Sequence, residues 1–184
     1  MKQSIIELIE RFLPESEYTS SDPEPVSPED LNAFEQAIKK YFTGFFAPDF
    51  VNTHWRLPDD YQAFLSLGIR ITYTSDGALE EDIYAYDQVQ DATTQPWYDF
   101  DMDELKKRAE ADKLLKFDTI WLNIGWWGDK HEYFICCDQS HPYFGKVIDG
   151  HDSTPWGSAY FSEDYESFTD FLEKLLKEEE EEDY

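Results

Sequence analysis

Apolar residues recur at the spacing of an amphipathic helix in two segments near the start of the chain. The first runs from Ile5 to Leu13 and ends at Pro14, which cannot continue a helix. The second is predicted to begin after Ser27, which has the chemistry of an N-cap, with Pro28 in the first helical position. Its predicted buried face carries Leu31, Phe34, Ala37, Ile38 and Tyr41 or Phe42.

A third, shorter helix is predicted from Leu57 to Leu65, and Gly68 is expected to stop it. The pattern then changes to strict alternation between residues 69 and 74, which is typical of a half-buried strand. Asp76-Gly77 predicts a tight turn, and the returning strand is expected from Asp82 to Asp87.

The second half of the chain reads as a run of strands between two helices. Leu105, Ala109, Leu114 and Leu115 indicate an amphipathic helix from Asp103 to Lys116. A last helix is expected from Asp164 to Lys177. The strands predicted between them are 120–124, 132–138, 145–148 and 159–161, with Gly125 and Gly128 permitting a tight connection after the first.

This order of elements predicts a single-domain α+β fold, in which a mainly antiparallel, meandering β-sheet packs with N-terminal and C-terminal helices. Residues 1–26 are expected to form the N-terminal helix and an acidic loop rich in Pro and Ser. Residues 27–177 form the predicted α+β domain, with an acidic insert at 80–104, and residues 178–184 form an acidic tail.

The composition adds a strong charge imbalance to this picture. The 184 residues include 41 acids and 15 bases, for a net charge of −26, and no Lys or Arg occurs from Ile71 to Leu105. Aromatic residues nevertheless make up 17%, which is enough for a packed core. The acid fits either a solvated acidic surface or a surface that meets a cationic partner, and the lack of basic clusters argues against nucleic acid as the partner.

No apolar run approaches the roughly 20 residues of a membrane span, and Glu7 and Glu10 interrupt the first apolar segment. We therefore expect a cytoplasmic protein with no membrane partner. The adjacent Cys136 and Cys137 are expected to be ordinary thiols in a reducing compartment, with a strained vicinal disulfide as the alternative.

Two segments resemble a known family. Leu57 and Pro58, followed after two residues by Tyr61 and then by Phe64 and Leu65, resemble a helix motif of the SUKH superfamily, named partly for a fungal regulator of cell-wall synthesis. The second match spans residues 121–176. It comprises Ile124-Gly125, Gly128-Asp129, the strand Tyr133 to Cys136, Gly145-Lys146-Val147, His151-Asp152 and the helix Ser167 to Leu172.

The resemblance implies a non-enzymatic protein-binding module. Many bacterial members of the superfamily look like immunity proteins that neutralise polymorphic toxins, often nucleases. The expected partner is thus a cognate basic toxin domain, and the chain itself is compatible with a monomer or a dimer. Two alternatives remain: an intracellular regulatory scaffold of the fungal type, and a metal-dependent hydrolase.

Motifs for catalysis or metal binding are weak in this sequence. Four histidines and nearby acids lack the spacing of a zinc site, and the alternating acids from Asp99 to Asp103 lack the glycine and distal Glu of a calcium loop. Neither cysteine has the electropositive surroundings of a nucleophile. We therefore expect no enzymatic activity, no cofactor and no metal.

Acids and adjacent aromatics together predict a partner-binding surface. Acidic residues steer a basic partner over long range, and buried aromatics commonly dominate the energy of the bound state. The alternative for each aromatic pair is that one ring plugs the edge of the sheet. The predicted steering residues are Asp82, Asp87, Asp91, Asp99 and Asp101, and the predicted anchors are Trp97, Trp126, Trp127 and Trp156.

Overall fold

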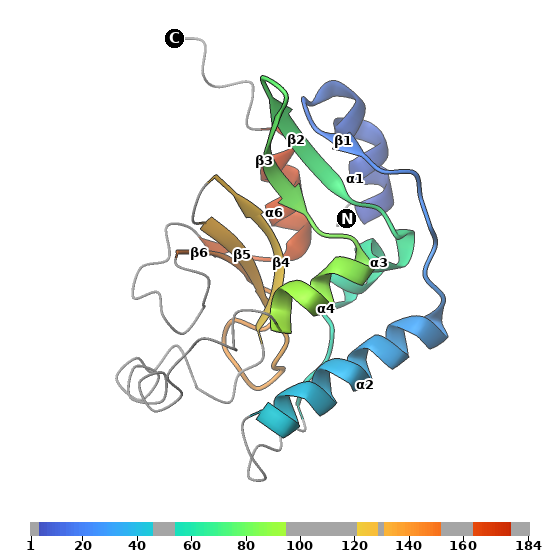
Figure 1. Ribbon diagram of the computed structural model, residues 1–184, viewed down its shortest axis with the longest axis vertical. Helices are drawn as coiled ribbons and strands as arrows, with labels where there is room; N and C mark the ends of the chain where they lie inside the picture. The colour runs from blue at the N-terminus through green and yellow to red at the C-terminus, as the bar shows by residue number, and fades with distance from the viewer. Residues whose placement is uncertain (1–3, 46–53, 95–120, 129–130, 152–163, 178–184) are drawn as a thin grey trace.

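The computed structural model describes residues 4–45, 54–94, 121–128, 131–151 and 164–177 (Figure 1). In these residues, strands pair in chain order into one antiparallel sheet, and helices pack on both of its faces. The α+β class with a meandering antiparallel sheet is confirmed. Within the same ranges, no helix combines the length and apolar character needed to cross a membrane.

The sheet is a meander, because each strand pairs with the next one along the chain. A meander needs no crossover connection, so neighbouring strands are also neighbours in sequence order. The strands are β1 (Thr19–Ser20), β2 (Ile71–Ser75), β3 (Ala78–Ile83), β4 (Trp121–Trp127), β5 (His131–Cys136), β6 (Val147–His151) and β7 (Asp164–Tyr165).

The helices begin and end largely where capping residues predict. Ser4 and Glu7 form a reciprocal capping box at the first helix, and the Ser27 hydroxyl accepts a hydrogen bond from the backbone N–H of Asp30. Gly68 ends the third helix in the left-handed region at φ 61°. The helices are α1 (Ile5–Phe12), the 3-10 turn η1 (Leu13–Glu15), α2 (Pro28–Phe45), α3 (Asp59–Leu67), α4 (Tyr86–Thr94) and α6 (Phe168–Leu175).

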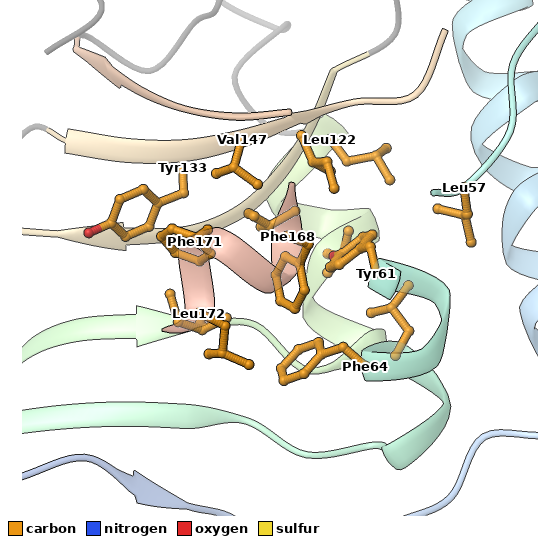
Figure 2. Packing of buried hydrophobic residues seen from close by; sticks show 14 of the residues in the cluster. Leu57, Tyr61, Phe64, Leu122, Tyr133, Val147, Phe168, Phe171 and Leu172 are labelled. Atoms are coloured by element: carbon orange, nitrogen blue, oxygen red, sulfur yellow. The ribbon is translucent and has the colours of Figure 1, made fainter. Parts of the chain in front are cut away.

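Aromatic side chains from α3 and α6 form the centre of the core. Figure 2 shows Phe168 between Tyr61 of α3 and Phe171 of α6, with ring centroids 4.9 and 5.8 Å away. Phe171 also contacts Tyr133 of β5 at 4.7 Å, which places α6 against the face of the sheet that Tyr133 occupies. Helix α4 lies on the opposite face (Figure 1).

The returning strand begins earlier than predicted, and the prediction of a strand from Asp82 to Asp87 is wrong. Asp76 and Gly77 both have positive φ, 51° and 81°, so they form a two-residue hairpin turn and Ser75 pairs directly with Ala78. The strand therefore ends at Ile83, and α4 follows from Tyr86. Residues 80–83 of the predicted acidic insert are part of the sheet.

Two other boundaries differ from prediction. Asp164 and Tyr165 pair with β6 instead of opening the last helix, which begins after Ser167 caps it at the backbone N–H of Asp170. Strand β4 also continues through Trp126 and Trp127, which were expected in a turn. The predicted helix 103–116 and strand 159–161 lie outside the described residues.

Candidate functional site

A row of directly opposed residues crosses the sheet on the face away from α6. Asp82 of β3 lies opposite Trp126 of β4, which lies opposite Glu132 of β5. Directly opposed residues project from the same face, so the indole of Trp126 is flanked by a carboxylate on each side. The row continues to Thr72 of β2 and Gly150 of β6.

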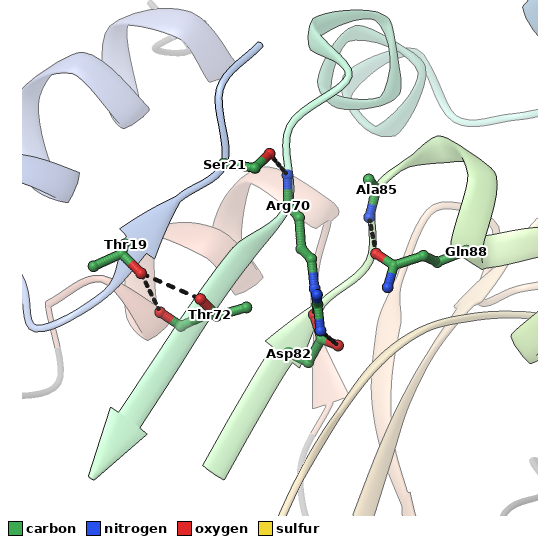
Figure 3. Close-up of polar contacts among 7 residues, drawn as sticks. All are labelled: Thr19, Ser21, Arg70, Thr72, Asp82, Ala85 and Gln88. Carbon is green, nitrogen blue, oxygen red and sulfur yellow. Dashed lines mark hydrogen bonds and ion pairs between the residues drawn. The ribbon is translucent and has the colours of Figure 1, made fainter. Parts of the chain in front are cut away.

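Asp82 is already engaged in this row. Its two carboxylate oxygens accept hydrogen bonds from Nε and Nη2 of Arg70 at 2.7 and 2.6 Å (Figure 3), and the residue is only 2% exposed. This hydrogen bonding to Asp82 raises the pKa of Arg70, which therefore stays charged. Asp82 was expected on the partner-binding surface, and this expectation is wrong, because Asp82 is buried and paired with Arg70.

Tyr84 lies two residues after Asp82, just beyond the end of β3. Burial is the main cause that raises the pKa of its hydroxyl, and the negative charges of Asp82 and Glu132 raise it further. Both carboxylates are thus close enough to act on one phenol. The hydroxyl remains protonated, so this part of the face presents a neutral donor among acids.

Helix α4 adds exposed acids beside the row. Asp87 and Asp91 are both exposed and lie four residues apart, so they share one side of the helix. The charge of Asp87 contributes to the raised pKa of Arg70, which ties the start of α4 to the Asp82 pair. Gln88 fixes this end of the helix, since its Oε1 accepts the backbone N–H of Ala85 at 3.2 Å (Figure 3).

The structure divides the predicted Trp126–Trp127 pair between the two faces of the sheet. Trp127 is 38% exposed, but it stacks on His131 with centroids 4.1 Å apart and donates from Nε1 to Asp149 at 3.2 Å. Trp126 is partly exposed and, among the described residues, makes neither a ring contact nor a hydrogen bond. Trp127 is thus held in a local cluster, whereas Trp126 is less exposed but is partly accessible on the opposite face.

A buried polar network lies on the face that carries Trp127. Glu81, only 7% exposed, accepts hydrogen bonds from the hydroxyls of Tyr18 and Tyr133, the latter at 2.6 Å. Burial raises the pKa of Tyr133, and the charge of Glu81 adds to this effect. His131 Nδ1 lies 3.0 Å from Asp149, which is also buried.

Sequence reasoning missed this network. The signal that would have found it is strand alternation, because Glu81 shares a face with Ile83, and Asp149 shares one with Val147. Acidic residues at core-facing positions require partners when they are buried.

A groove of about 520 Å³ lies elsewhere, where the N-terminal ends of α1, α3 and α6 meet. Its charged residues largely pair with their neighbours: Arg56 bonds Asp59, and Lys146 bonds Glu166 at 2.6 Å. Asp60 of α3 accepts hydrogen bonds from the backbone and hydroxyl of Thr169 in α6, both at 3.0 Å. The Asp60–Thr169 contacts of this groove therefore tie α3 to α6.

The sequence predictions also concerned other site residues, the possible metal ligands and the two cysteines. Trp97, Asp99, Asp101 and Trp156 lie outside the described residues. Within the described ranges, no group of three or more His, Cys, Asp or Glu side chains is arranged to hold a metal ion. Cys136 and Cys137 are free thiols and fully buried, and burial raises the pKa of Cys136 to about 12.

The candidate functional site is thus the acidic and aromatic face formed by Trp126, Glu132, Tyr84 and the exposed side of α4, with the Arg70–Asp82 pair beneath it. We call it the Trp126 face. Comparison of the chain with protein-family models gives no match, and neither curated proteins nor solved structures give a significant match.

Proposed function

We propose that this protein is a non-enzymatic binding module that acts in the cytoplasm as an immunity protein and neutralises a basic toxin domain. The resemblance to the SUKH superfamily supplies the class of function. The observation that carries the proposal is the Trp126 face, where a partly exposed indole lies between carboxylates in a chain of net charge −26.

The physical chemistry of this face favours a cationic protein surface. Exposed acids such as Asp87 and Asp91 raise the local concentration of a positively charged partner and speed its association. This steering acts over about 8 Å at physiological ionic strength and weakens as salt is added. The partly exposed Trp126 supplies the apolar contact that prolongs the bound state.

The proposed mechanism is competitive. A nuclease toxin carries a basic surface for the phosphates of its substrate. Carboxylates on the Trp126 face imitate that pattern of negative charge and occupy the surface. The protein itself performs no chemical step in this mechanism.

The test is a pull-down with this protein from its native cells, followed by co-expression with any basic toxin domain that is recovered and by binding kinetics with the purified pair. We expect the protein to restore growth, and the association rate to fall about tenfold or more from low to physiological salt. Failure to restore growth, with recovery of many regulatory proteins instead, would favour the scaffold alternative.

A matched pair of variants locates the binding face. Asp87→Asn with Asp91→Asn removes two exposed charges from the Trp126 face, and Glu10→Gln with Glu15→Gln removes two exposed charges near α1. The first pair should slow association several-fold more than the second. Equal effects would mean that only the total charge matters, and would assign binding to no particular face.

A further inference from the structure

The edge of the sheet at β1 is open over a short window. Among the described strands, β1 lies at one end of the sheet, and residues 19–22 are exposed. Ser21 donates its backbone N–H to the carbonyl of Arg70 at 2.9 Å, and its hydroxyl accepts the N–H of Arg70 at 3.0 Å (Figure 3). Successive residues of an antiparallel strand direct their backbone groups to opposite sides, so the N–H and C=O of Ser20 point away from β2. No hydrogen bond within the described part of the chain uses these two groups.

Both ends of this window are closed. The N–H groups of Glu24 and Val26 bond carbonyls at the end of α3, at 3.2 and 3.0 Å. Pro23 and Pro25 therefore take the outward positions, where proline has no N–H to donate. Before the window, the N–H of Tyr18 is bonded to a serine hydroxyl two residues earlier, at 3.3 Å. Only the short window between these closed ends can accept another strand.

The charge around the window selects the kind of strand that can pair there. Asp22 and Glu24 are exposed, and no Lys or Arg occurs between Arg11 and Lys39. A second copy of this acidic chain would bring like charges together across the new strand pair, which destabilises the pair. A basic strand would meet opposite charges instead. The edge is therefore guarded against copies of itself and suits a basic segment.

The β1 edge also lies on the row of opposed residues that carries Trp126. Thr19 is opposite Thr72, which is opposite Asp82, and Asp82 is opposite Trp126. Neighbouring strands are about 4.8 Å apart, so β1 is roughly 15 Å from β4. One partner domain of ordinary size can span this distance and contact both the edge and the Trp126 face.

We propose that the β1 edge is a docking site for an extended, basic segment of the partner, which adds to the sheet as a further strand. The backbone of this segment pairs with the N–H and C=O of Ser20, and its Lys or Arg side chains lie beside Asp22 and Glu24. Main-chain hydrogen bonds supply affinity in this mode of recognition, and side chains supply selectivity. The inference rests on the proposed function for the positive charge of the partner, and it specifies how that partner is held.

The test uses the full chain and the peptide N-acetyl-Lys-Val-Lys-Val-Lys-amide, with backbone amide signals followed by NMR. We expect this peptide to shift the signals of Ser20 and Asp22 more than those of α4, and its analogue with Glu in place of Lys to shift neither. The same basic peptide, N-methylated along its backbone, keeps its charge and loses its donors. It should bind about two- to tenfold more weakly, the effect of about one hydrogen bond.

A matched pair of variants at position 20 tests the same contact from the side of the protein. Ser20→Pro removes an N–H that the fold does not use, whereas Ser20→Ala keeps it. The proline variant should weaken binding of the basic peptide about two- to tenfold, and the alanine variant should leave it unchanged. Circular dichroism and thermal denaturation check that each variant is folded, and the N-methylated peptide decides the question if the proline variant does not fold.

Four results would overturn this docking site: equal affinity for the N-methylated and unmodified basic peptides, a Ser20 signal unmoved at millimolar peptide, equal shifts with the acidic peptide, or unchanged binding by a folded Ser20→Pro variant. Failure of the two proposals is distinguishable. Pairing of the basic peptide without protection from a toxin would refute the immunity role and leave the docking site. Toxin binding that Ser20→Pro leaves unchanged would refute the docking site alone.

Discussion

At the scale of single residues, the same amino-acid type has opposite roles in this protein. Asp82 is buried and paired with Arg70, whereas Asp87, five residues later, is exposed on α4. A buried carboxylate stabilises the fold only while its partner is present, since an uncompensated buried charge is costly. Exposed acids have little effect on stability and remain available to a partner.

This difference gives a prediction for Arg70→Met, which leaves Asp82 buried without its counter-ion. We expect the free energy of unfolding, measured by urea denaturation, to fall by about 1–3 kcal/mol. The double variant Arg70→Met with Asp82→Leu should recover much of this loss, because removing both partners leaves no orphaned charge. A double variant as unstable as the single one would show that the pair matters for packing and not for charge compensation.

At the scale of elements, two connections depend on a glycine with positive φ: the one from α3 to β2 and the one from β2 to β3. Gly68 ends α3 at φ 61°, and a Cβ there would lie 1.8 Å from the carbonyl oxygen of Glu24. Gly77 in the β2–β3 turn also has positive φ, 81°, but a Cβ would meet nothing within 4 Å. Any residue with a Cβ would therefore be strained by the left-handed backbone at either position. At position 68 it would also clash with Glu24.

The two glycines form a matched pair for mutagenesis. Gly77→Ala should lower the free energy of unfolding by about 1–2 kcal/mol, the cost of left-handed backbone for a residue with a Cβ. Gly68→Ala should lower it by about 3 kcal/mol or more, since the segment before α2 must also move. Thermal or chemical denaturation of both variants checks this order, and equal losses would show that the Glu24 segment yields easily.

At the scale of the whole molecule, burial keeps several phenol and thiol groups protonated. Burial raises the pKa values of Tyr61 and Tyr133 from 10.0 and those of Cys136 and Cys137 from 9.0. Below about pH 8 these groups keep their protons in both the folded and unfolded states. Above that range, the unfolded chain loses protons that the folded chain retains, so rising pH favours unfolding.

We therefore predict a steep loss of stability in alkali. Between about pH 9 and pH 11, each buried group that ionises only on unfolding lowers the free energy of unfolding by up to about 1.4 kcal/mol per pH unit. Guanidinium denaturation at a series of pH values measures this slope, and tyrosinate absorbance of the folded protein reports which phenols remain protonated. A denaturation midpoint that is constant up to pH 11 would contradict the prediction.

Local sequence signals predicted the start of α2 and the end of α3. Ser27, Pro28 and Gly68 act on the residues next to them, so caps and stops can be recognised without knowing the fold. The boundary between β3 and α4 was predicted wrongly, because it depends on how the Asp76-Gly77 turn sets the register of the hairpin. Charge and aromatic content indicated Asp87, Asp91 and Trp126, but not the Arg70–Asp82 pair.

The amino-acid pattern was sufficient for the α+β class, for the starts of α1 and α2 and for a strongly acidic surface, since each follows from composition or from neighbours in the chain. The tertiary structure decided which acids are exposed and on which face of the sheet each of two adjacent tryptophans lies. Strand register joins residues distant in sequence, and a shift of one residue would exchange Trp126 and Trp127 between the faces of the sheet. The Trp126 face therefore exists only in the paired strands, because Asp82, Trp126 and Glu132 come from three of them.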